Sequence, residues 1–176
     1  TYLSSGGSDG PRQSVALEGA AMHLLRAGQA YDAAGHAVAF TDRIGVGTPG
    51  CDGPSQLEAQ GAPTLGNASF ALTLDGGPGA GFGALVIANG LDGLGSDSLG
   101  LGVILHLVPT SNVLIETAVF PDATGAASLP LPLPQNPALA GTTLWAQGLW
   151  GWPFGPCAPS PSLLSSSNAV GFTLLP

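Results

Sequence analysis

Glycine and proline interrupt this sequence every few residues, and that spacing restricts the chain to short elements joined by tight turns. The 176 residues include 28 Gly and 16 Pro, while apolar residues make up 44%. Both Gly and Pro are unfavourable inside helices and favourable in turns. We therefore predict an all-β chain, long enough for one domain with a buried core and an extension.

Eight short segments in the second half of the chain have the composition of β-strands. Phe70, Leu72 and Leu74 fall on one face of such a strand, with Ala71 and Thr73 on the other. Short strands at regular spacing, with turn signals between them, are typical of an antiparallel β-sandwich of the jelly-roll or immunoglobulin-like kind. The expected strands cover residues 56–60, 68–74, 83–88, 101–108, 113–120, 126–133, 142–149 and 170–175.

Residues 128–134, SLPLPLP, alternate leucine with proline. Because proline has no N–H to donate to a strand ladder, we predict an edge strand or a polyproline II ribbon that lays its leucines on the core. The missing N–H groups would also protect that edge from unwanted strand pairing.

Residues 14–44 differ from the rest, because all three arginines lie in or beside them and the stretch is rich in Ala and Leu. As a helix, this stretch would have only a loose apolar stripe, and Gly19 inside it would cost about 1 kcal/mol. As strands, 14–18 and 21–27 would flank Gly19, and residues 31–40 would form a hairpin around Ala34 and Gly35. The strand interpretation is preferred.

The segment 45–55, GVGTPGCDGPS, contains four Gly and two Pro and is the predicted domain boundary. Before it, residues 1–44 would form an N-terminal β extension that is able to donate a strand to a neighbour. After it, residues 56–176 would form the β-sandwich domain.

Charged residues are scarce, at 8% of the chain against about 25% in ordinary soluble domains, and no lysine or arginine follows Arg43. Nucleic acid, anionic lipid and phosphorylated ligands are contacted mainly through Lys and Arg, so the sequence disfavours these partners. The formal net charge is −8. No apolar run reaches the roughly 18 residues that a bilayer-spanning helix needs, so membrane insertion is not expected.

The two cysteines, Cys51 and Cys157, are widely separated, and neither lies in a CxxC or Cys/His cluster typical of zinc sites. In an oxidising compartment, a disulfide between them would stabilise the fold by about 4–5 kcal/mol in the chain-entropy model. This disulfide is preferred over two free buried thiols.

Three segments of the second half share a distinctive pattern. They are GCDGPSQLEAQGAPTLGNASFALTL (residues 50–74), GAASLPLPLPQNPALAGTTLWAQGL (125–149) and SNAVGFTLLP (167–176). The pattern resembles the β-sandwich module often found at the C-terminal end of secreted planctomycete proteins, and the resemblance covers residues 50–176. It implies a secreted or cell-surface location and a non-catalytic role, and it supplies no active site to carry over.

Groups that could perform catalysis are few. No GxSxG motif occurs, and His23, His36 and His106 have no neighbouring acid at a suggestive spacing. His106 lies in the apolar segment GVILHLV, where a hydrogen-bonded structural histidine is expected. His23 and His36 lack a nearby third ligand for a metal. We predict no enzyme activity, no catalytic residue and no cofactor.

Asp92 and Asp97 lie in the Gly-rich segment NGLDGLGSDS and form a weak calcium candidate. Carboxylates and exposed carbonyls on a flexible loop are typical calcium ligands, but the spacing of an EF-hand is absent. A solvated turn is the preferred interpretation.

Four aromatic residues, Trp145, Trp150, Trp152 and Phe154, occur within ten positions. Trp145 is expected in the core. Trp150, Trp152 and Phe154 lie among Gly and Pro, where they could cover one end of the sandwich or form an exposed contact for a sugar ring or a neighbouring subunit. The sequence leaves both interpretations open.

Two functions from different classes fit these observations. The first is a non-catalytic extracellular structural protein that assembles into a homo-oligomer, filament or surface layer, with the N-terminal extension pairing with the next subunit. The second is a secreted carbohydrate-binding or adhesion module that stacks polysaccharide on Trp150 and Trp152. The first is preferred.

Overall fold

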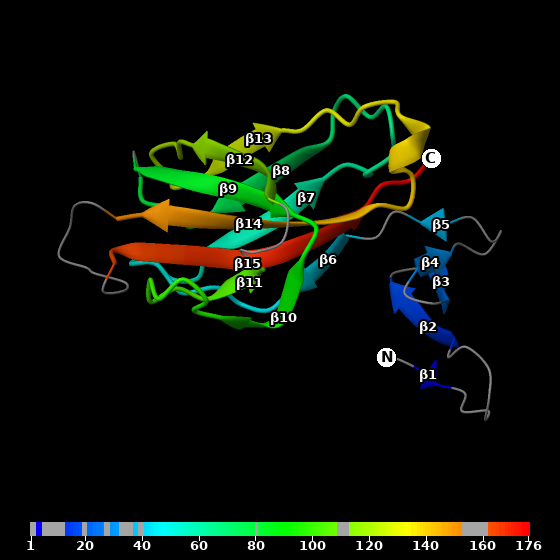
Figure 1. The fold of residues 1–176 in the computed structure, drawn as a ribbon, viewed down its shortest axis with the longest axis horizontal. Coiled ribbons are helices and arrows are strands. Elements are labelled where there is room, and N and C mark those ends of the chain that lie inside the picture. The colour runs from blue at the N-terminus through cyan, green and yellow to red at the C-terminus, as the bar shows by residue number, and fades with distance from the viewer. Residues whose placement is uncertain are drawn as a thin grey trace.

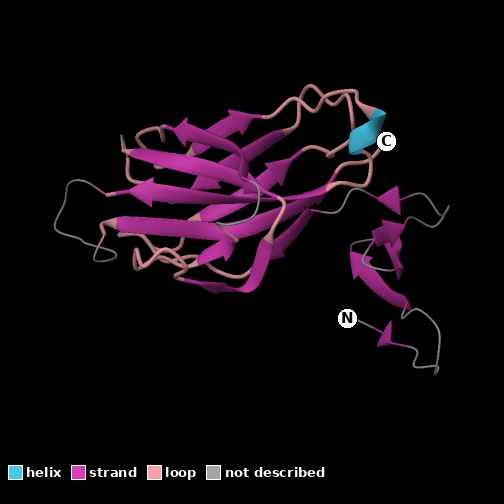
Figure 2. Cartoon of the chain, viewed as in Figure 1, coloured by secondary structure: helices cyan, strands magenta, loops and turns pink. Residues whose placement is uncertain are grey.

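The computed structural model describes the backbone of the strands within residues 1–40, and residues 41–79, 81–108, 113–152 and 162–176. These residues form β-strands and loops, with one 3-10 helix, η1 (Pro137–Leu139), as Figures 1 and 2 show. The all-β prediction is confirmed. The strands are β1 (Leu3–Ser4), β2 (Gln13–Glu18), β3 (Ala21–Arg26), β4 (Gln29–Tyr31), β5 (Ala37–Val38), β6 (Thr41–Ile44), β7 (Gln56–Gln60), β8 (Ala71–Asp75), β9 (Phe82–Ala88), β10 (Leu91–Ser96), β11 (Leu105–Leu107), β12 (Val113–Val119), β13 (Ala127–Pro130), β14 (Thr143–Gly151) and β15 (Leu164–Thr173).

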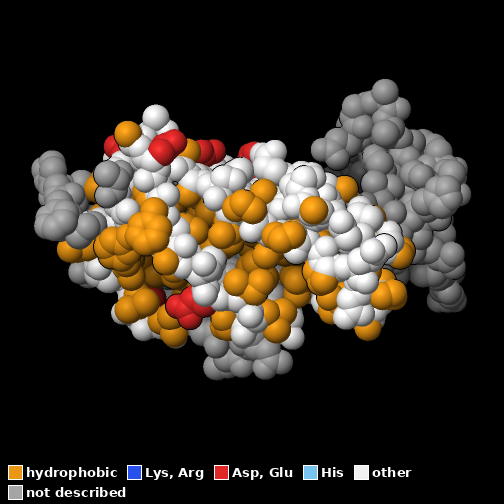
Figure 3. Space-filling model, turned by 90° about the horizontal axis from the view of Figure 1, so that it is seen from above, with side chains coloured by type: hydrophobic (Ala, Val, Ile, Leu, Met, Phe, Trp, Pro, Cys, Tyr) orange, Lys and Arg blue, Asp and Glu red, His pale blue; other side chains and the backbone are white. Residues whose placement is uncertain are grey.

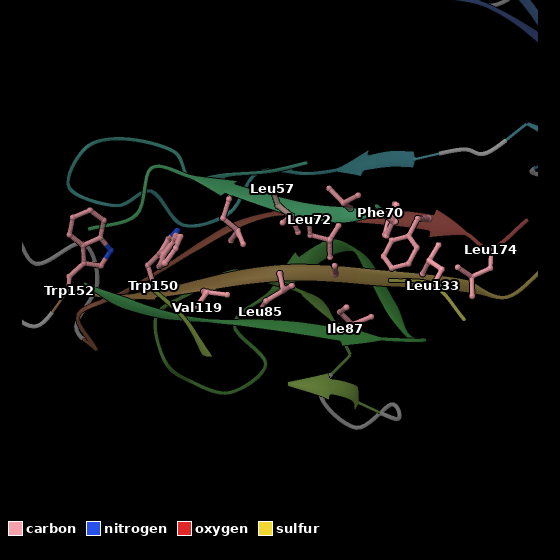
Figure 4. Packing of buried hydrophobic residues seen from close by; sticks show 14 residues of the cluster. Leu57, Phe70, Leu72, Leu85, Ile87, Val119, Leu133, Trp150, Trp152 and Leu174 are labelled. Carbon is pink, nitrogen blue, oxygen red and sulfur yellow. The ribbon is translucent and has the colours of Figure 1, made fainter. Parts of the chain in front are cut away.

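Two antiparallel sheets form the sandwich and enclose the core. The larger sheet has the strand order β12-β9-β14-β15-β6, and the smaller has the order β13-β8-β7. Figure 4 shows the core side chains in the space between the two layers, with Trp150 and Trp152 at one end and Phe70, Leu133 and Leu174 at the other. The rings of Phe70 and Phe172 meet with their centroids 5.2 Å apart. This arrangement is the sandwich that the alternating segments predict.

The proline-rich segment begins as an edge strand, one of the two structures predicted for it, and the strand ends at Pro130. β13 lies at the edge of the smaller sheet and pairs with β8, with Leu129 opposite Leu72. Beyond its end, the N–H groups of Leu131 and Leu133 still donate to backbone carbonyls, while Pro132 between them has no N–H. The alternation of Leu and Pro therefore allows pairing on the inner side and limits it on the outer side.

The sandwich begins earlier than the predicted boundary. β6 pairs with β15 in the larger sheet, with Thr41 opposite Phe172 and Ile44 opposite Ala169. The segment 45–55 belongs to the same unit, since Ser55 is 2% exposed and forms a parallel bridge with Ser167. β6 reads TDRI, so its polar composition gave no sign that it is part of the sandwich.

Two further elements differ from the prediction. β10 occupies the Gly-rich segment that was predicted to be a turn, and it pairs with β11 in a separate two-stranded sheet. β15 begins at Leu164, six residues before the expected start, because its first half is polar yet buried. Because the buried residues of this segment are polar, it shows no alternation of apolar residues from which a strand could be predicted.

The N-terminal strands β1 to β5 form their own five-stranded antiparallel sheet in chain order. β2 and β3 lie on either side of Gly19, which confirms strands rather than a helix. β4 and β5 pair as the predicted hairpin, with Tyr31 opposite Ala37. Within the described residues, no helix is long and apolar enough to cross a membrane.

Candidate functional site

The outer face of the larger sheet carries an apolar pocket. On β9 and β14, residues alternate between the core and this outer face, where Val86 and Leu149 are half-buried. β11 covers part of the face, and beside it lies a pocket of about 660 Å³, including the solvent at its mouth. We call it the outer pocket. Among the described residues that line it, seven are apolar and two are polar: Val86, Leu99, Leu105, Leu107, Val108, Val113, Leu149, Glu116 and Gln147.

The pocket adjoins an exposed apolar strand. β12 lies at the edge of the larger sheet and pairs with β9, and its side chains of Val113, Leu114 and Ile115 are 45%, 53% and 37% exposed. Phe120, just after the strand, is 73% exposed. Exposed apolar edge strands are preferred places for pairing with another chain. We call Val113–Val119 the β12 edge.

Figure 3 views the molecule from the side on which β12 and β13 lie uppermost in Figure 1. Hydrophobic side chains extend over much of this face, acidic ones occur in only a few places, and no Lys or Arg is visible among the described residues. Large apolar surfaces with few charges are typical of protein–protein interaction sites.

Buried hydrogen bonds fix the wall of the pocket. Gln147, 1% exposed, accepts a hydrogen bond from the His106 backbone N–H at 2.8 Å. Its side-chain N–H group donates to the carbonyls of Ile104 at 3.1 Å and Ser167 at 2.9 Å. These bonds attach β11 to β14 and β15, so this wall is held in place before any partner binds. Nothing in the sequence marks Gln147 for this role.

The His106 side chain is structural. It is 1% exposed, and its Nδ1 and Nε2 lie 3.3 Å from the Asp92 carbonyl oxygen and 3.1 Å from the Val46 carbonyl oxygen. Gly45 and Gly95 leave room for the ring, since an added Cβ at either position would lie 2.2 or 2.6 Å from Cε1. Both ring nitrogens face backbone carbonyls, which fits the structural role expected from the sequence. The structure describes only the backbone of His23, and His36 lies outside the described residues.

The Asp92 and Asp97 carboxylates are acceptors for their own loops. Asp92 accepts hydrogen bonds from the backbone N–H groups of Leu94 and Gly95, both at 3.2 Å, and from the Ser96 hydroxyl at 2.8 Å. Asp97 accepts from Leu101 N–H at 2.8 Å and Gly102 N–H at 2.9 Å. Among the described residues, no group of three or more His, Cys, Asp or Glu could hold a metal ion.

Asp122 is a third carboxylate that accepts hydrogen bonds from its own loop, and we expect acid to reduce its contribution to stability. Hydrogen bonds from the Thr124 hydroxyl and from the Ala126 and Thr124 N–H groups lower the pKa of Asp122 below its usual 3.8. A folded-state pKa below the unfolded one gives stability that is present above about pH 4 and is lost as pH falls through the folded pKa. We expect Asp122→Asn to reduce the fall in urea midpoint between pH 5 and pH 2, and Thr124→Val to do so in part. An unchanged pH profile in Asp122→Asn would contradict this.

Trp150 and Trp152 do not form an exposed platform, so that interpretation is wrong for both. They are 0% and 6% exposed, and their indole N–H groups donate to the hydroxyls of Ser55 at 2.9 Å and Ser165 at 2.8 Å. Gly83 makes room for the Trp150 ring, since an added Cβ there would lie 2.3 Å from it. Both residues therefore belong to the core, the other interpretation that the sequence left open. Phe154 lies outside the described residues.

Trp145 was expected in the core but is only half-buried. It follows Leu144 in the alternation of β14 and lies on the outer face, where an added Cβ on Gly171 would be 2.2 Å from its ring. The strand pattern alone does not show which face of a sheet is covered by another layer.

Cys51 is half-buried, packs against the core cluster and is not a free thiol. Cys157 lies outside the described residues, so its pairing with Cys51 stays a prediction.

The fold and the site define an antiparallel β-sandwich with an apolar surface at one edge of its larger sheet. No known protein family, curated protein or solved structure matches this chain. Its function is therefore inferred from its own residues.

Proposed function

We propose that this protein is a non-catalytic structural subunit that assembles with copies of itself outside the cell. The observation that carries the proposal is the β12 edge with its adjoining outer pocket, an apolar surface left uncovered by the sandwich. Uncovered surface of this kind is normally buried by a partner.

The N-terminal sheet supplies a second candidate contact, because it is an open five-stranded sheet. Its register places Leu3, Val15, Leu24 and Tyr31 in one row across the strands. Leu17 and Met22 pair two positions further along. An open sheet ends in two edge strands, here β1 and β5, and an edge strand can pair with a strand of another chain.

Charge and compartment support the same proposal. With only 8% charged residues, copies of the chain repel one another weakly at close range, while the net charge of −8 favours solubility of the free subunit. The resemblance of residues 50–176 to modules of secreted proteins supports an extracellular, cell-surface location. A Cys51 to Cys157 disulfide in that compartment is part of the proposal. Carbohydrate binding on Trp150 and Trp152 is not proposed, because both rings are buried.

Removal of residues 1–40 tests the proposal. We expect the full chain to form oligomers or fibres and the truncated chain to remain a folded monomer, because β6 stays in the larger sheet. Sedimentation velocity and negative-stain electron microscopy measure assembly, and far-UV circular dichroism checks the fold.

A longer truncation is the matched control. Removal of residues 1–44 also deletes β6 and leaves β15 unpaired along that edge, so this variant should be less stable than the one that starts at Thr41. If the truncation to Thr41 assembles like the full chain, or if the full chain stays monomeric at every concentration, the proposal fails.

A further inference from the structure

We propose that the open side of the sandwich between β6 and β7 binds a neutral sugar residue of a polysaccharide, held by the Arg43 guanidinium and the Glu58 carboxylate. This inference goes beyond the proposed self-assembly and is independent of it, because β6 and β12 are opposite edges of the larger sheet.

A groove lies between the free edges of the two sheets. β6 is the last strand of the larger sheet and β7 that of the smaller, and together they line a groove of about 550 Å³, including the solvent at its mouth. We call it the β6–β7 groove. Small-molecule sites have volumes of about 300–1,000 Å³. The described residues of its floor and walls include Thr41, Arg43, Leu57, Glu58, Ala59 and Val170.

The floor of the groove is apolar. Leu57 on β7 is 0% exposed and Val170 on β15 is 3% exposed; both belong to the core cluster, against which Ala59 packs. Because these side chains are already packed in the folded core, the floor is in place before any ligand binds. The C–H groups of a sugar ring can pack on aliphatic side chains of this kind, while its hydroxyls contact the polar walls.

Arg43 supplies the donors. It lies opposite Val170, a core residue, so its side chain leaves β6 on the side that faces the smaller sheet. It donates to Gln56 Oε1 and lies 3.6 Å from Glu58 Oε1, and both contacts use Nη2. A guanidinium has five N–H donors in a planar fork. Nε and Nη1, which make no hydrogen bond within the described residues, can therefore bind two neighbouring hydroxyls of a sugar.

Glu58 supplies the acceptor beside this fork. The side chains of Arg43 and Glu58 are 47% and 57% exposed, so a ligand in the groove can reach both. A carboxylate accepts protons from hydroxyl groups, and such charge-assisted hydrogen bonds are stronger than neutral ones. Asp42 also lines the groove, so acidic groups outnumber Arg43 there and disfavour an anionic ligand, as does the net charge of −8. A neutral ligand rich in hydroxyls fits this mixture of donors and acceptors.

Backbone groups at the two edges add further donors and acceptors. Leu174 hydrogen bonds to residues 141 and 142, on the β14 side. Because hydrogen bonds alternate in direction along an antiparallel strand, the residue of β15 opposite Arg43 also bonds to β14, and the Arg43 backbone points away from β15. On β7, the Leu57 backbone binds the Asn168 side chain, so the Ala59 N–H and C=O, two residues later, also point away from β8.

Binding of neutral polysaccharides to the full-length chain tests the site. The probes are soluble mannan, dextran and laminarin, with polygalacturonate as the anionic comparison, and affinity electrophoresis measures the dissociation constants. We expect at least one neutral probe to bind and polygalacturonate not to bind. Arg43→Met and Glu58→Gln should each weaken that binding at least about tenfold, because each removes charge-assisted hydrogen bonds. Asp52→Asn, the same carboxylate-to-amide change at an exposed position outside the groove, is the matched control and should bind like the wild type.

Arg43→Lys separates sugar binding from a simpler role. A cation on the inward side of an edge strand also discourages unwanted strand pairing, and lysine would do the same. Binding two hydroxyls needs the planar fork, so we expect Arg43→Lys to weaken binding about as much as Arg43→Met. The urea midpoint of each variant establishes that it is folded.

Several outcomes would overturn the site. If no neutral probe binds, or if folded Arg43→Met binds like the wild type, the sugar is not held here. If Arg43→Lys binds like the wild type, the fork is not what holds it. If no probe binds and Arg43→Met prevents assembly, the groove is a contact between copies and not a sugar site. The proposed function is tested separately, by removal of residues 1–40.

Discussion

Replacement of Trp150 by alanine is expected to lower the free energy of unfolding by about 3–5 kcal/mol, a large share of the 5–15 kcal/mol typical of a domain. The indole is fully buried, and Gly77 and Gly83 lie against it, where an added Cβ would be 2.7 and 2.3 Å from ring atoms. Glycines have no side chain that could move into the space left by the ring. The loss should therefore include a cavity term as well as the lost burial of the ring.

Two variants separate the contributions of Trp150. Trp150→Phe keeps an aromatic ring but loses the hydrogen bond to the Ser55 hydroxyl, whose own proton still goes to the Asp75 carbonyl at 2.7 Å. We expect this variant to lose about 1–2 kcal/mol. Leu94→Ala, at a side chain that is 95% exposed, should change stability by less than about 0.5 kcal/mol. Urea unfolding followed by far-UV circular dichroism measures all three, and equal midpoints for Trp150→Ala and Leu94→Ala would contradict the expected core role.

The strands that could be predicted are those with one apolar face. β8 and β9 place alternate residues in the core, and that alternation is visible in the sequence. β6 and the first half of β15 lack it, since residues 165–168 of β15 are three serines and an asparagine, all buried. Their side chains also make hydrogen bonds to residues far away in the chain, such as the one from the Thr48 N–H to the Ser166 hydroxyl. A sequence pattern cannot predict hydrogen-bond partners that come close together only in the folded chain.

The candidate site was only partly predictable for a similar reason. The sequence predicted a strand at 113–120, but its place at the edge of the larger sheet depends on strand order, which composition does not encode. The edge position of β13, in contrast, could be predicted, because its proline-rich sequence lacks N–H groups that a central strand would need for pairing. For Trp150 and Trp152, the deciding contacts come from Gly83 and Gly50, which are remote in sequence and give the rings their space. Aromatic residues among glycines are compatible with a core and with a contact surface alike.

Replacement of Asn168 by leucine should destabilise the sandwich by separating its two sheets at β7. Asn168 is 3% exposed, and its side chain accepts from the Leu57 N–H at 2.9 Å and donates to the Leu57 carbonyl at 3.0 Å. The backbone bridge between Ser167 and Ser55 lies just before β7, and the Asn168 side chain supplies the next hydrogen bonds from β15, to the Leu57 backbone. Leucine would leave two buried backbone groups without these partners, at about 1–3 kcal/mol for each.

The identity of the lost bonds can be tested with pH. In Asn168→Asp, the carboxylate can still accept from the Leu57 N–H, but only its protonated form can donate to the Leu57 carbonyl. Burial should raise the pKa of the introduced carboxyl above its unfolded value, so the stability of this variant should increase as pH falls from about 7 to 5, whereas that of Asn168→Leu should not. Gln135→Leu, an amide-to-leucine change at an exposed position, is the control and should unfold at the wild-type urea midpoint. If Asn168→Leu also unfolds there, the side chain of Asn168 does not hold β7 to the larger sheet.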